Sequence, residues 1–415
     1  MLAPEQQFEI LARGTEEILP EGALLERLRK CAAAGRPLRV KQGFDPTAPD
    51  IHLGHTVGLR KLRQFQELGH QVVLIVGDYT GLVGDPSGRS KTRPQLEAQE
   101  LEANARTYLD QFYRVLDPRP QPPCLPVEVH RNGEWFAPMS FAEVIRLAAQ
   151  YTVSRLLERD DFAKRLQANQ PISVHELLYP LMQGHDSVAI LADVELGATE
   201  QKFNLVVGRE LQRLAGQEPQ VVLTLPVLPG LDGVQRMSKS LGNYIGVTDA
   251  PTEMFGKVMS LPDSVLRLFW ALVTDAPPDE LAAVERELAD AAINPMTIKK
   301  RLGERIVTMY HDADAALQAR AGFDAQFSRR EVPENLDEFS RETLLNFAAK
   351  PAAPIIIDAL MAAGFSDSRS AARRLVEQKA VRIDGEVVTS WDQAVDPGKE
   401  FVLRAGRKMK RFAGK

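Results

Sequence analysis

The chain has 415 residues, more than a single compact core usually takes, so its length predicts about two to four domains. Apolar residues make up 44% of the chain and charged residues 26%, fractions that are typical of a globular protein and exclude a disordered or fibrous chain. The two cysteines, Cys31 and Cys124, lie far apart and outside any CxxC spacing, so we expect no disulfide framework and no structural zinc site.

The amino-terminal stretch MLAPEQQFEILARGTEE lacks the basic start and apolar run of a secretory signal. No stretch approaches the roughly eighteen uncharged apolar residues of a membrane span. The sequence therefore predicts a cytoplasmic protein with no membrane partner.

Positive charge is concentrated at the carboxyl end, although the whole chain has a formal net charge of -5. Residues 369–415 hold twelve Lys/Arg and six Asp/Glu, an excess of six positive charges that leaves the remainder at -11. Such a distribution is typical of a terminal module that contacts phosphates. A solvated basic tail that only aids solubility is the alternative.

The first 230 or so residues predict an α/β fold. Residues 38–44 form a short mixed run, and the loop 45–50 is followed by an amphipathic helix over 57–68. Residues 72–76 (VVLIV) are a continuous apolar run, as in a strand buried on both faces of a parallel sheet. Strand, helix and strand in this order form a βαβ unit, whose ligands gather at the carboxyl ends of the strands.

The later segments predict two further kinds of structure. Residues 221–225 (VVLTL) are a second buried strand, and the region of about 110–165 is an insertion that joins the two halves of a split nucleotide-binding fold. Residues 251–349 are predicted to be all helical. A linker at Pro351 and Pro354 precedes two short helices and a hairpin that turns at Asp384-Gly385.

The first chemical signature is His52-Leu53-Gly54-His55, which follows a strand and opens a helix. Imidazole N–H groups and a helix N-terminus both favour anionic oxygens, and Gly54 lets a ligand approach the backbone. Zinc binding is an alternative, but no third ligand lies at a known metal spacing. A chance HxxH is the other alternative, which the position after Asp45-Pro46-Thr47 disfavours.

The second signature is Arg236-Met237-Ser238-Lys239-Ser240, in a glycine-flanked loop after a buried strand. Mobile cations there can close over the β- and γ-phosphates of a nucleotide and balance charge that develops during transfer. A solvated basic loop is the usual alternative. The pairing with His52 and His55 favours the nucleotide.

The combination of these two signatures resembles the class I aminoacyl-tRNA synthetases. Residues 44–55, 77–94 and 179–204 are similar to tyrosyl-tRNA synthetases of bacterial type, and residues 368–388 resemble the S4 RNA-binding domain. The resemblance covers almost the entire chain. It implies a split Rossmann-like catalytic domain over 1–230, a signature loop at 231–250, an all-α anticodon-side domain at 251–349 and a small α+β S4-like domain at 355–415.

A polar stripe provides an independent indication of the substrate. Tyr179, Gln183 and Asp186 fall at i, i+4 and i+7 of a predicted helix over 176–191, so they share one face. These groups either satisfy one another or bind a ligand. In the ligand interpretation Asp186 accepts the phenol O–H of tyrosine, because rejecting phenylalanine needs a buried partner for the hydroxyl. No long insertion suggests an editing domain.

The resemblance assigns the other site residues, and it implies ATP as substrate, Mg²⁺ with the ATP and no tightly bound metal. The partners it implies are L-tyrosine, tRNA(Tyr) and a second copy of the chain, which would dimerise through the inserted region. The tyrosine-binding residues are Lys41, Thr80, Asp85, Tyr179, Gln183, Asp186 and Gln201, with Tyr179, Gln183 and Asp85 at the α-ammonium group. The residues around the nucleotide are Gly43, Asp45, Gly54 and Glu200, and those at the phosphates are Thr47, His52, His55, Arg89, Arg93, Arg236 and Lys239. The expected tRNA contacts are Arg369, Arg373, Arg374, Arg407, Lys408, Lys410 and Arg411.

Several positions depart from the family pattern. Arg236 replaces the usual lysine, which keeps the charge but changes the hydrogen-bond geometry, and Glu200 and Ala198 stand where Asp and Gly are common. Lys41 occupies a place that many members fill with a tyrosine that helps to bind the phenol. We expect Lys41 either to contact the hydroxyl or to pair with Asp186.

Three alternatives compete with this interpretation. A tryptophanyl-tRNA synthetase shares the fold, but the S4-like tail, the HxGH ending and Asp186 argue against it. A small-molecule nucleotidyltransferase does not explain the RMSKS loop together with the basic domain. A former synthetase that only binds RNA would not need His52, His55 and Lys239.

Overall fold

The computed structural model describes residues 2–46, 50–87, 98–325, 336–351, 353–406 and 408–414. The chain forms two compact units, Met1–Leu317 and Gln318–Lys415. None of the helices in the described segments is long and apolar enough to cross a membrane.

A six-stranded sheet forms the centre of the first unit. Its strands are β1 (Glu17–Leu19), β2 (Arg39–Phe44), β3 (Gln71–Val76), β4 (Glu128–Arg131), β5 (Val194–Ala198) and β6 (Val221–Leu225). Their order is β1-β6-β5-β2-β3-β4; all neighbours are parallel except β1, which runs antiparallel to β6. The apolar runs of β3 and β6 are buried, as their sequences predict.

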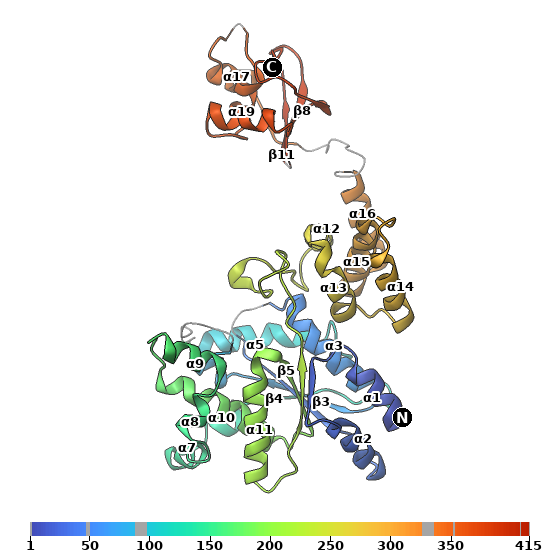
Figure 1. Ribbon diagram of the computed structural model, residues 1–415, viewed down its shortest axis with the longest axis vertical. Helices are drawn as coiled ribbons and strands as arrows, with labels where there is room; N and C mark the ends of the chain where they lie inside the picture. Colours follow the sequence, from blue (N-terminus) through green and yellow to red (C-terminus); the bar gives the residue numbers. More distant parts are fainter. Residues whose placement is uncertain are drawn as a thin grey trace. The chain divides into compact units, whose positions relative to one another are not determined.

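Helices cover both faces of this sheet. They are α1 (Pro4–Ala12), α2 (Ala23–Ala33), α3 (Leu53–Glu67), α4 (Thr80–Val83), α5 (Ala98–Phe112), α10 (Val174–Ala189) and α11 (Lys202–Leu214). The step from β2 to β3 and the step from β5 to β6 run in opposite directions across the sheet. Because parallel crossovers are right-handed, α3 and α11 must lie on opposite faces. Figure 1 shows this arrangement, with α1 and α2 near α3 and with α10 beside α11.

The region predicted as an insertion contributes to the sheet as well as to the helices around it. Its residues 128–131 form β4, which extends the sheet beyond β3. Four residues with only one apolar side chain give no strand signal, so this edge strand was not predicted. The remaining elements are α6 (Gly133–Phe136), α7 (Phe141–Ala148), α8 (Val153–Leu156) and α9 (Asp160–Gln167).

The segment after the sheet is helical and belongs to the first compact unit up to Leu317, but the prediction that all of 251–349 is helical is wrong, because residues 338–339 form a strand of the second unit. Its helices are α12 (Pro251–Ser260), α13 (Leu266–Val273), α14 (Pro278–Ala289), α15 (Pro295–Tyr310) and α16 (Ala313–Phe323). Three of them begin with proline, whose missing N–H costs nothing at the first helical position. Helix α13 packs against α3 and so joins the helical part to the sheet.

The second unit is a small α+β fold. Its sheet has the order β7-β11-β10-β8-β9. The elements are β7 (Glu338–Phe339), α17 (Arg341–Phe347), α18 (Ile356–Ala362), α19 (Arg369–Glu377), β8 (Val381–Ile383), β9 (Glu386–Val387), β10 (Phe401–Ala405) and β11 (Lys408–Phe412). The predicted hairpin at Asp384 joins β8 to β9, and the Ser368 side chain caps α19. Phe339 and Leu344, which the sequence placed in the helical domain, pack into the core of this unit.

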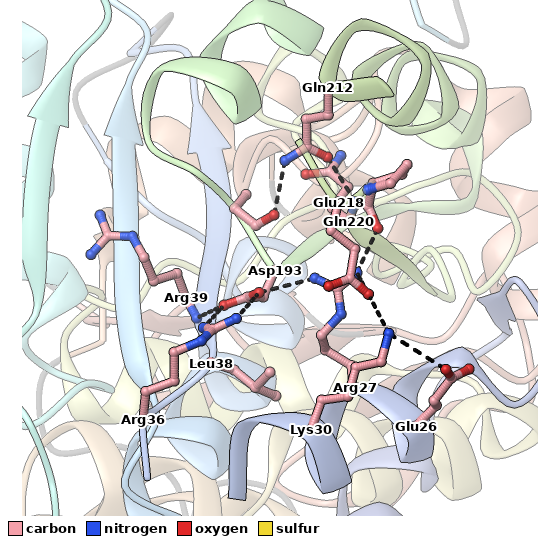
Figure 2. A network of polar contacts seen from close by, with 12 residues as sticks. Glu26, Arg27, Lys30, Arg36, Leu38, Arg39, Asp193, Gln212, Glu218 and Gln220 are labelled. Atoms are coloured by element: carbon pink, nitrogen blue, oxygen red, sulfur yellow. Dashed lines mark hydrogen bonds and ion pairs between the residues drawn. The ribbon is translucent and has the colours of Figure 1, made fainter. Parts of the chain in front are cut away.

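A buried ion cluster lies at the amino ends of the strands (Figure 2). Asp193, directly before β5, accepts hydrogen bonds from the guanidinium groups of Arg27 and Arg36 at 2.7–3.0 Å. It also accepts one from the backbone N–H of Arg39 at 2.9 Å, which ties the start of β2 to that of β5. Burial opposes ionisation of Asp193, but these hydrogen bonds outweigh it and hold its pKa below the ordinary value.

We expect Asp193→Asn to lower the free energy of unfolding by up to about 3–5 kcal/mol, because the buried Arg27 charge loses its buried counter-ion and keeps only the half-exposed Glu218 as an ionic partner. Urea denaturation measures the change. Since the folded-state pKa of Asp193 is depressed, its contribution is present above the unfolded pKa and is lost as the pH falls through the folded value. Glu26→Gln is the matched control: because its ion pair with Lys30 is solvent-exposed, its loss should hardly change the free energy of unfolding. A loss no larger than the control's would contradict the expectation.

Candidate active site

A cavity of about 470 Å³ opens at the carboxyl ends of the parallel strands, where ligands of such sheets bind. The end of β2, the start of α3, the end of β5 and the loop after β6 all contribute to it. Eleven of the predicted site residues line it: Gly43, Asp45, His52, Gly54, His55, Asp85, Tyr179, Glu200, Gln201, Arg236 and Lys239. The two sequence signatures therefore meet at one opening, although about 180 residues separate them in the chain.

The two histidines form a stacked pair at the start of α3. His52 is the N-cap residue, and the ring centroids of His52 and His55 are 3.8 Å apart. Burial lowers the pKa of His52 to about 2 and that of His55 to about 4, helped by the nearby Lys239 charge, so both rings are neutral near pH 7. The His55 Nδ1 accepts the His52 backbone N–H, which puts the His55 proton on Nε2.

Gly54 is needed at its position because of this pair. A Cβ there would lie 2.9 Å from the Cε1 atom of His52, and the stacked ring has little freedom to withdraw. The absence of a side chain thus keeps the His52 ring in place at the cavity.

Carboxylates hold the cations of the signature loop. The Lys239 ammonium forms an ion pair with Asp50 at 2.8 Å, and the Arg236 guanidinium forms one with Glu200 at 2.8 Å. Asp50 was not predicted as a site residue; its place two residues before His52 was the only available signal. Both cations are thus balanced by carboxylates that also line the cavity.

Tyr179, Thr80 and Asp45 form one connected group. The Tyr179 hydroxyl donates to Asp45 Oδ2 at 2.8 Å, and the Thr80 hydroxyl donates to Asp45 Oδ1 at 2.8 Å. Asp45 follows β2 and Thr80 begins α4, so their contact joins two neighbouring strand ends. Asp45 therefore connects the nucleotide side of the predicted site to its tyrosine side.

Asp186 lies buried on α10 and does not line the cavity. Its Oδ1 accepts the indole N–H of Trp135 at 2.9 Å, and its Oδ2 accepts a weaker hydrogen bond from the Asn132 amide at 3.4 Å. Burial raises the pKa of Asp186 to about 7, against the opposing effects of Lys41 and these two donors. Sequence analysis missed Asn132 and Trp135, because no local pattern pairs residues more than fifty positions apart.

Lys41 is fully buried and forms its ion pair with Glu195, at 3.0 Å. It also donates to the Ser187 hydroxyl and to the backbone carbonyl of Gln183, both at 2.8 Å. The predicted pairing with Asp186 is wrong. Lys41 and Glu195 are direct partners in the parallel register of β2 and β5, so their side chains emerge on the same face.

Two further groups of predicted residues are not among the described residues that line the cavity. Thr80, Gln183 and Lys41 do not line the cavity, although each bonds to a residue at or near it. Thr47, Arg89, Arg93 and Arg407 lie outside the described residues. Among the described residues, no group of three or more His, Cys, Asp or Glu side chains is placed to hold a metal ion.

The basic residues that are expected to bind tRNA and that the structure describes lie on α19 and β11 of the second unit. The Arg373 guanidinium stacks over the Trp391 ring at 3.9 Å, a contact that the sequence did not predict. Arg369 pairs with the buried Asp358 at 2.7 Å. Arg374, Lys408, Lys410 and Arg411 are exposed or half-buried.

Comparisons with known proteins show the family to which the chain belongs. The family profile described as tRNA synthetases class I (W and Y) matches residues 33–328, and the S4 domain profile matches residues 357–401. The parallel sheet, the cavity and the two signatures thus define a class I aminoacyl-tRNA synthetase. A tyrosine–tRNA ligase of Moorella thermoacetica is 53% identical over 403 residues, 97% of this chain and 94% of that relative. One of Symbiobacterium thermophilum is 51% identical over 418 residues, 100% of this chain and 97% of the relative. The chain belongs to the tyrosine–tRNA ligases.

Solved structures of more distant proteins share the fold. The tyrosyl-tRNA synthetase of Archaeoglobus fulgidus, complexed with L-tyrosine, superposes with a TM-score of 0.61 at 22% identity and covers 76% of this chain and 100% of that chain. A truncated mitochondrial tyrosyl-tRNA synthetase of Aspergillus nidulans gives a TM-score of 0.62 at 19% identity, over 79% and 95% of the two chains.

Proposed function

We propose that this chain joins L-tyrosine to the 3′-terminal adenosine of tRNA(Tyr) in two steps, through a tyrosyl-adenylate made from ATP with release of pyrophosphate. The observation that carries this proposal is the single cavity lined by both signatures and by Asp85, Tyr179 and Gln201. A triphosphate at His52 and Lys239 and an amino acid at Tyr179 would therefore share one opening.

The first step needs no protein nucleophile. The tyrosine carboxylate attacks the α-phosphorus in line, so the chain contributes positioning and stabilisation of developing charge. The neutral rings of His52 and His55 supply N–H donors without repelling the cations, and Arg236 and Lys239 supply positive charge to the β- and γ-phosphates. Mg²⁺ would arrive with ATP and add charge at the phosphates.

When ATP binds, the cations of the signature loop must exchange their carboxylate partners for the phosphates. Lys239 and Arg236 start paired with Asp50 and Glu200, and a triphosphate offers each a stronger anionic partner. Thr47, Arg89 and Arg93 are proposed to contact the same phosphates, and Gly43, Gly54 and Glu200 the rest of the nucleotide.

The tyrosine substrate is proposed to lie between two sets of acceptors. Asp85, Tyr179 and Gln183 face its α-ammonium group, with Thr80 and Gln201 beside them. Asp186 accepts the phenol hydroxyl. The Trp135 and Asn132 donors hold the Asp186 carboxylate so that the phenol meets a fixed acceptor.

The second unit is proposed to bind tRNA(Tyr), with the helical region 251–349 on the anticodon side and residues 1–230, with the loop 231–250, activating tyrosine. Arg373 on its Trp391 platform and the basic residues of β11 support an RNA-binding role for 355–415.

We expect the double variant Lys408→Ala and Lys410→Ala to raise the KM for tRNA and to leave pyrophosphate exchange unchanged. Each lost phosphate contact should lower the slope of log affinity against log salt by about one. Lys399→Ala, in the same unit but outside the expected contacts, is the control. Equal losses in aminoacylation and in exchange would contradict the assignment.

A homodimer through the inserted region is part of the proposal. Four apolar side chains on α7, α8 and α9 are more than half exposed, and burying such side chains favours association with a partner. They are Phe141, Ile145, Val153 and Leu166. ATP and tRNA are cytoplasmic substrates, and we place the enzyme in that compartment.

ATP–pyrophosphate exchange with each amino acid in turn tests the proposed function. Tyrosine alone should support rapid exchange. Exchange with tryptophan but not with tyrosine would mean that tryptophan is the substrate. If no amino acid supports exchange, the chain would instead be a protein that only binds RNA.

A further inference from the structure

Arg159 is a buried cation that the proposed mechanism leaves unused. It is the N-cap residue of α9 in the inserted region and is 3% exposed. Its guanidinium donates to the Asn204 side-chain oxygen at 3.0 Å and to the Ser87 hydroxyl at 2.7 Å, and it pairs with Asp161 at 2.7 Å. These contacts begin two branches that lead to the tyrosine site.

The first branch reaches Asp85. The Ser87 hydroxyl accepts from Arg159 and donates to Asp85 Oδ1 at 2.6 Å, and the guanidinium itself lies 3.5 Å from the same oxygen. Gln201 donates to the other oxygen, Oδ2, at 3.1 Å. Both carboxylate oxygens are thus held at the cavity wall.

The second branch reaches Gln183. Asn204 accepts from Arg159 through Oδ1, so its Nδ2 donates to Gln183 Oε1 at 2.9 Å. Gln183 Nε2 donates in turn to Glu195 Oε1 at 3.0 Å. A guanidinium can only donate and a carboxylate can only accept, so this chain of bonds has one direction and fixes the orientation of both amides.

An ammonium group can only donate, so it needs acceptors held toward it. In Gln183 the sole side-chain acceptor is Oε1, which the second branch turns toward Asn204 and away from Glu195. We propose that Arg159 is a positioning residue for the α-ammonium group of tyrosine, acting through Asp85 and Gln183; this rests on the proposed tyrosine site. Removing the guanidinium takes one support from both acceptors at once, although Ser87 and Gln201 still donate to Asp85 and Gln183 still donates to Glu195. The inserted region therefore contributes to amino-acid recognition through Arg159.

Arg165 provides a matched comparison on the same helix. It is as buried as Arg159 and pairs with the buried Glu176 at 2.6 Å, at the start of α10. Its guanidinium donates to the Glu176 carboxylate and to the Pro171 carbonyl, and these two contacts do not lead to Asp85 or Gln183. Loss of this arginine should weaken the fold without affecting the ammonium site.

The test compares tyrosine with 3-(4-hydroxyphenyl)propanoate, which lacks only the ammonium group. In Arg159→Met we expect the KM for tyrosine in pyrophosphate exchange to rise at least about tenfold, while the inhibition constant of the deaminated acid changes less than about twofold. Arg159→Lys keeps the charge but supplies one nitrogen for two branches, so it should recover part of the loss. If Arg159→Met does not fold, the KM for tyrosine and the inhibition constant of the deaminated acid are compared in Arg159→Lys instead.

Arg165→Met should lower the melting temperature and leave the KM for tyrosine unchanged. Equal weakening of tyrosine and of the deaminated acid in Arg159→Met, or an unchanged KM, would overturn the proposal. Asp85→Asn distinguishes a failure of the proposed role of Arg159 from a failure of the proposed ammonium site. A raised KM there with an unchanged KM in Arg159→Met refutes only the role of Arg159, whereas an unchanged KM in Asp85→Asn refutes the ammonium site itself.

Discussion

Replacing Asp186 with asparagine is expected to lower the discrimination between tyrosine and phenylalanine about 10- to 100-fold, the value of a hydrogen bond to a charged group. Sites that bind a substrate hydroxyl reject an analogue without it by about 10⁴–10⁵, and tyrosyl-tRNA synthetases are themselves the standard example. The Asp186 carboxylate offers acceptors only, whereas an asparagine turns an NH₂ group toward one of its donors, Trp135 or Asn132, or toward the phenol.

The ratio of kcat/KM for the two amino acids in pyrophosphate exchange measures this change. Glu176→Gln is the matched control, because Glu176 is a buried carboxylate on the same helix that pairs with Arg165. It should cost stability and leave the ratio unchanged. An unchanged ratio in Asp186→Asn would place the phenol elsewhere.

The same residue makes the discrimination depend on pH. Burial raises the pKa of Asp186 to about 7, so the carboxyl group gains a proton as the pH falls from 8 to 6 and loses acceptor capacity. Discrimination should fall over that interval. The stability of the fold depends on pH in the opposite direction. The folded state holds the Asp186 proton more tightly than the unfolded state does. Protonated Asp186 therefore contributes fully to the free energy of unfolding at acidic pH, and this contribution is lost as the pH rises toward 7.

Lys239→Ala is expected to lower the rate of tyrosyl-adenylate formation about 10²- to 10³-fold, as removal of one preorganised charge donor does in other enzymes. The KM for tyrosine should change little, because Lys239 is proposed to contact the nucleotide and not the amino acid. Single-turnover kinetics of adenylate formation separates the two effects. Lys30→Ala, an exposed lysine on α2 that pairs with Glu218, is the control and should leave the rate unchanged.

A second variant removes an alternative explanation. Loss of Lys239 also leaves Asp50 without its ion pair, and an unpaired carboxylate could itself repel the phosphates. If repulsion by Asp50 were the whole cause, the double variant with Asp50→Ala would regain the lost rate. We expect the rate to stay low.

The sequence predicted the parts of the fold that have strong local signals. The apolar runs of β3 and β6 and the periodic pattern of α3 each determine one element over a few neighbouring residues. Edge strands β1 and β4 carry no such signal. They form because a neighbouring strand offers free backbone groups, which is a property of the assembled sheet.

The residues of the site also divide into those with a local sequence signal and those without one. His52, Lys239 and Asp186 stand in short motifs or on a helix face, so sequence alone could find them. Trp135 and Glu195 could not be found, because their roles come from partners that are distant in the chain. The wrong pairing of Lys41 has the same origin, because strand register decides its partner.

The fully buried pair of Lys41 and Glu195 has a consequence for the history of the family. Replacing either residue alone leaves one charge stranded in the interior, a change that costs about 3–5 kcal/mol, whereas replacing both with apolar residues can be neutral. A change from the charged pair to an uncharged pair therefore requires either a destabilised single variant or substitution of both residues together. Relatives with tyrosine in place of Lys41 should accordingly lack an acidic residue in place of Glu195, and the two positions should vary together across the family.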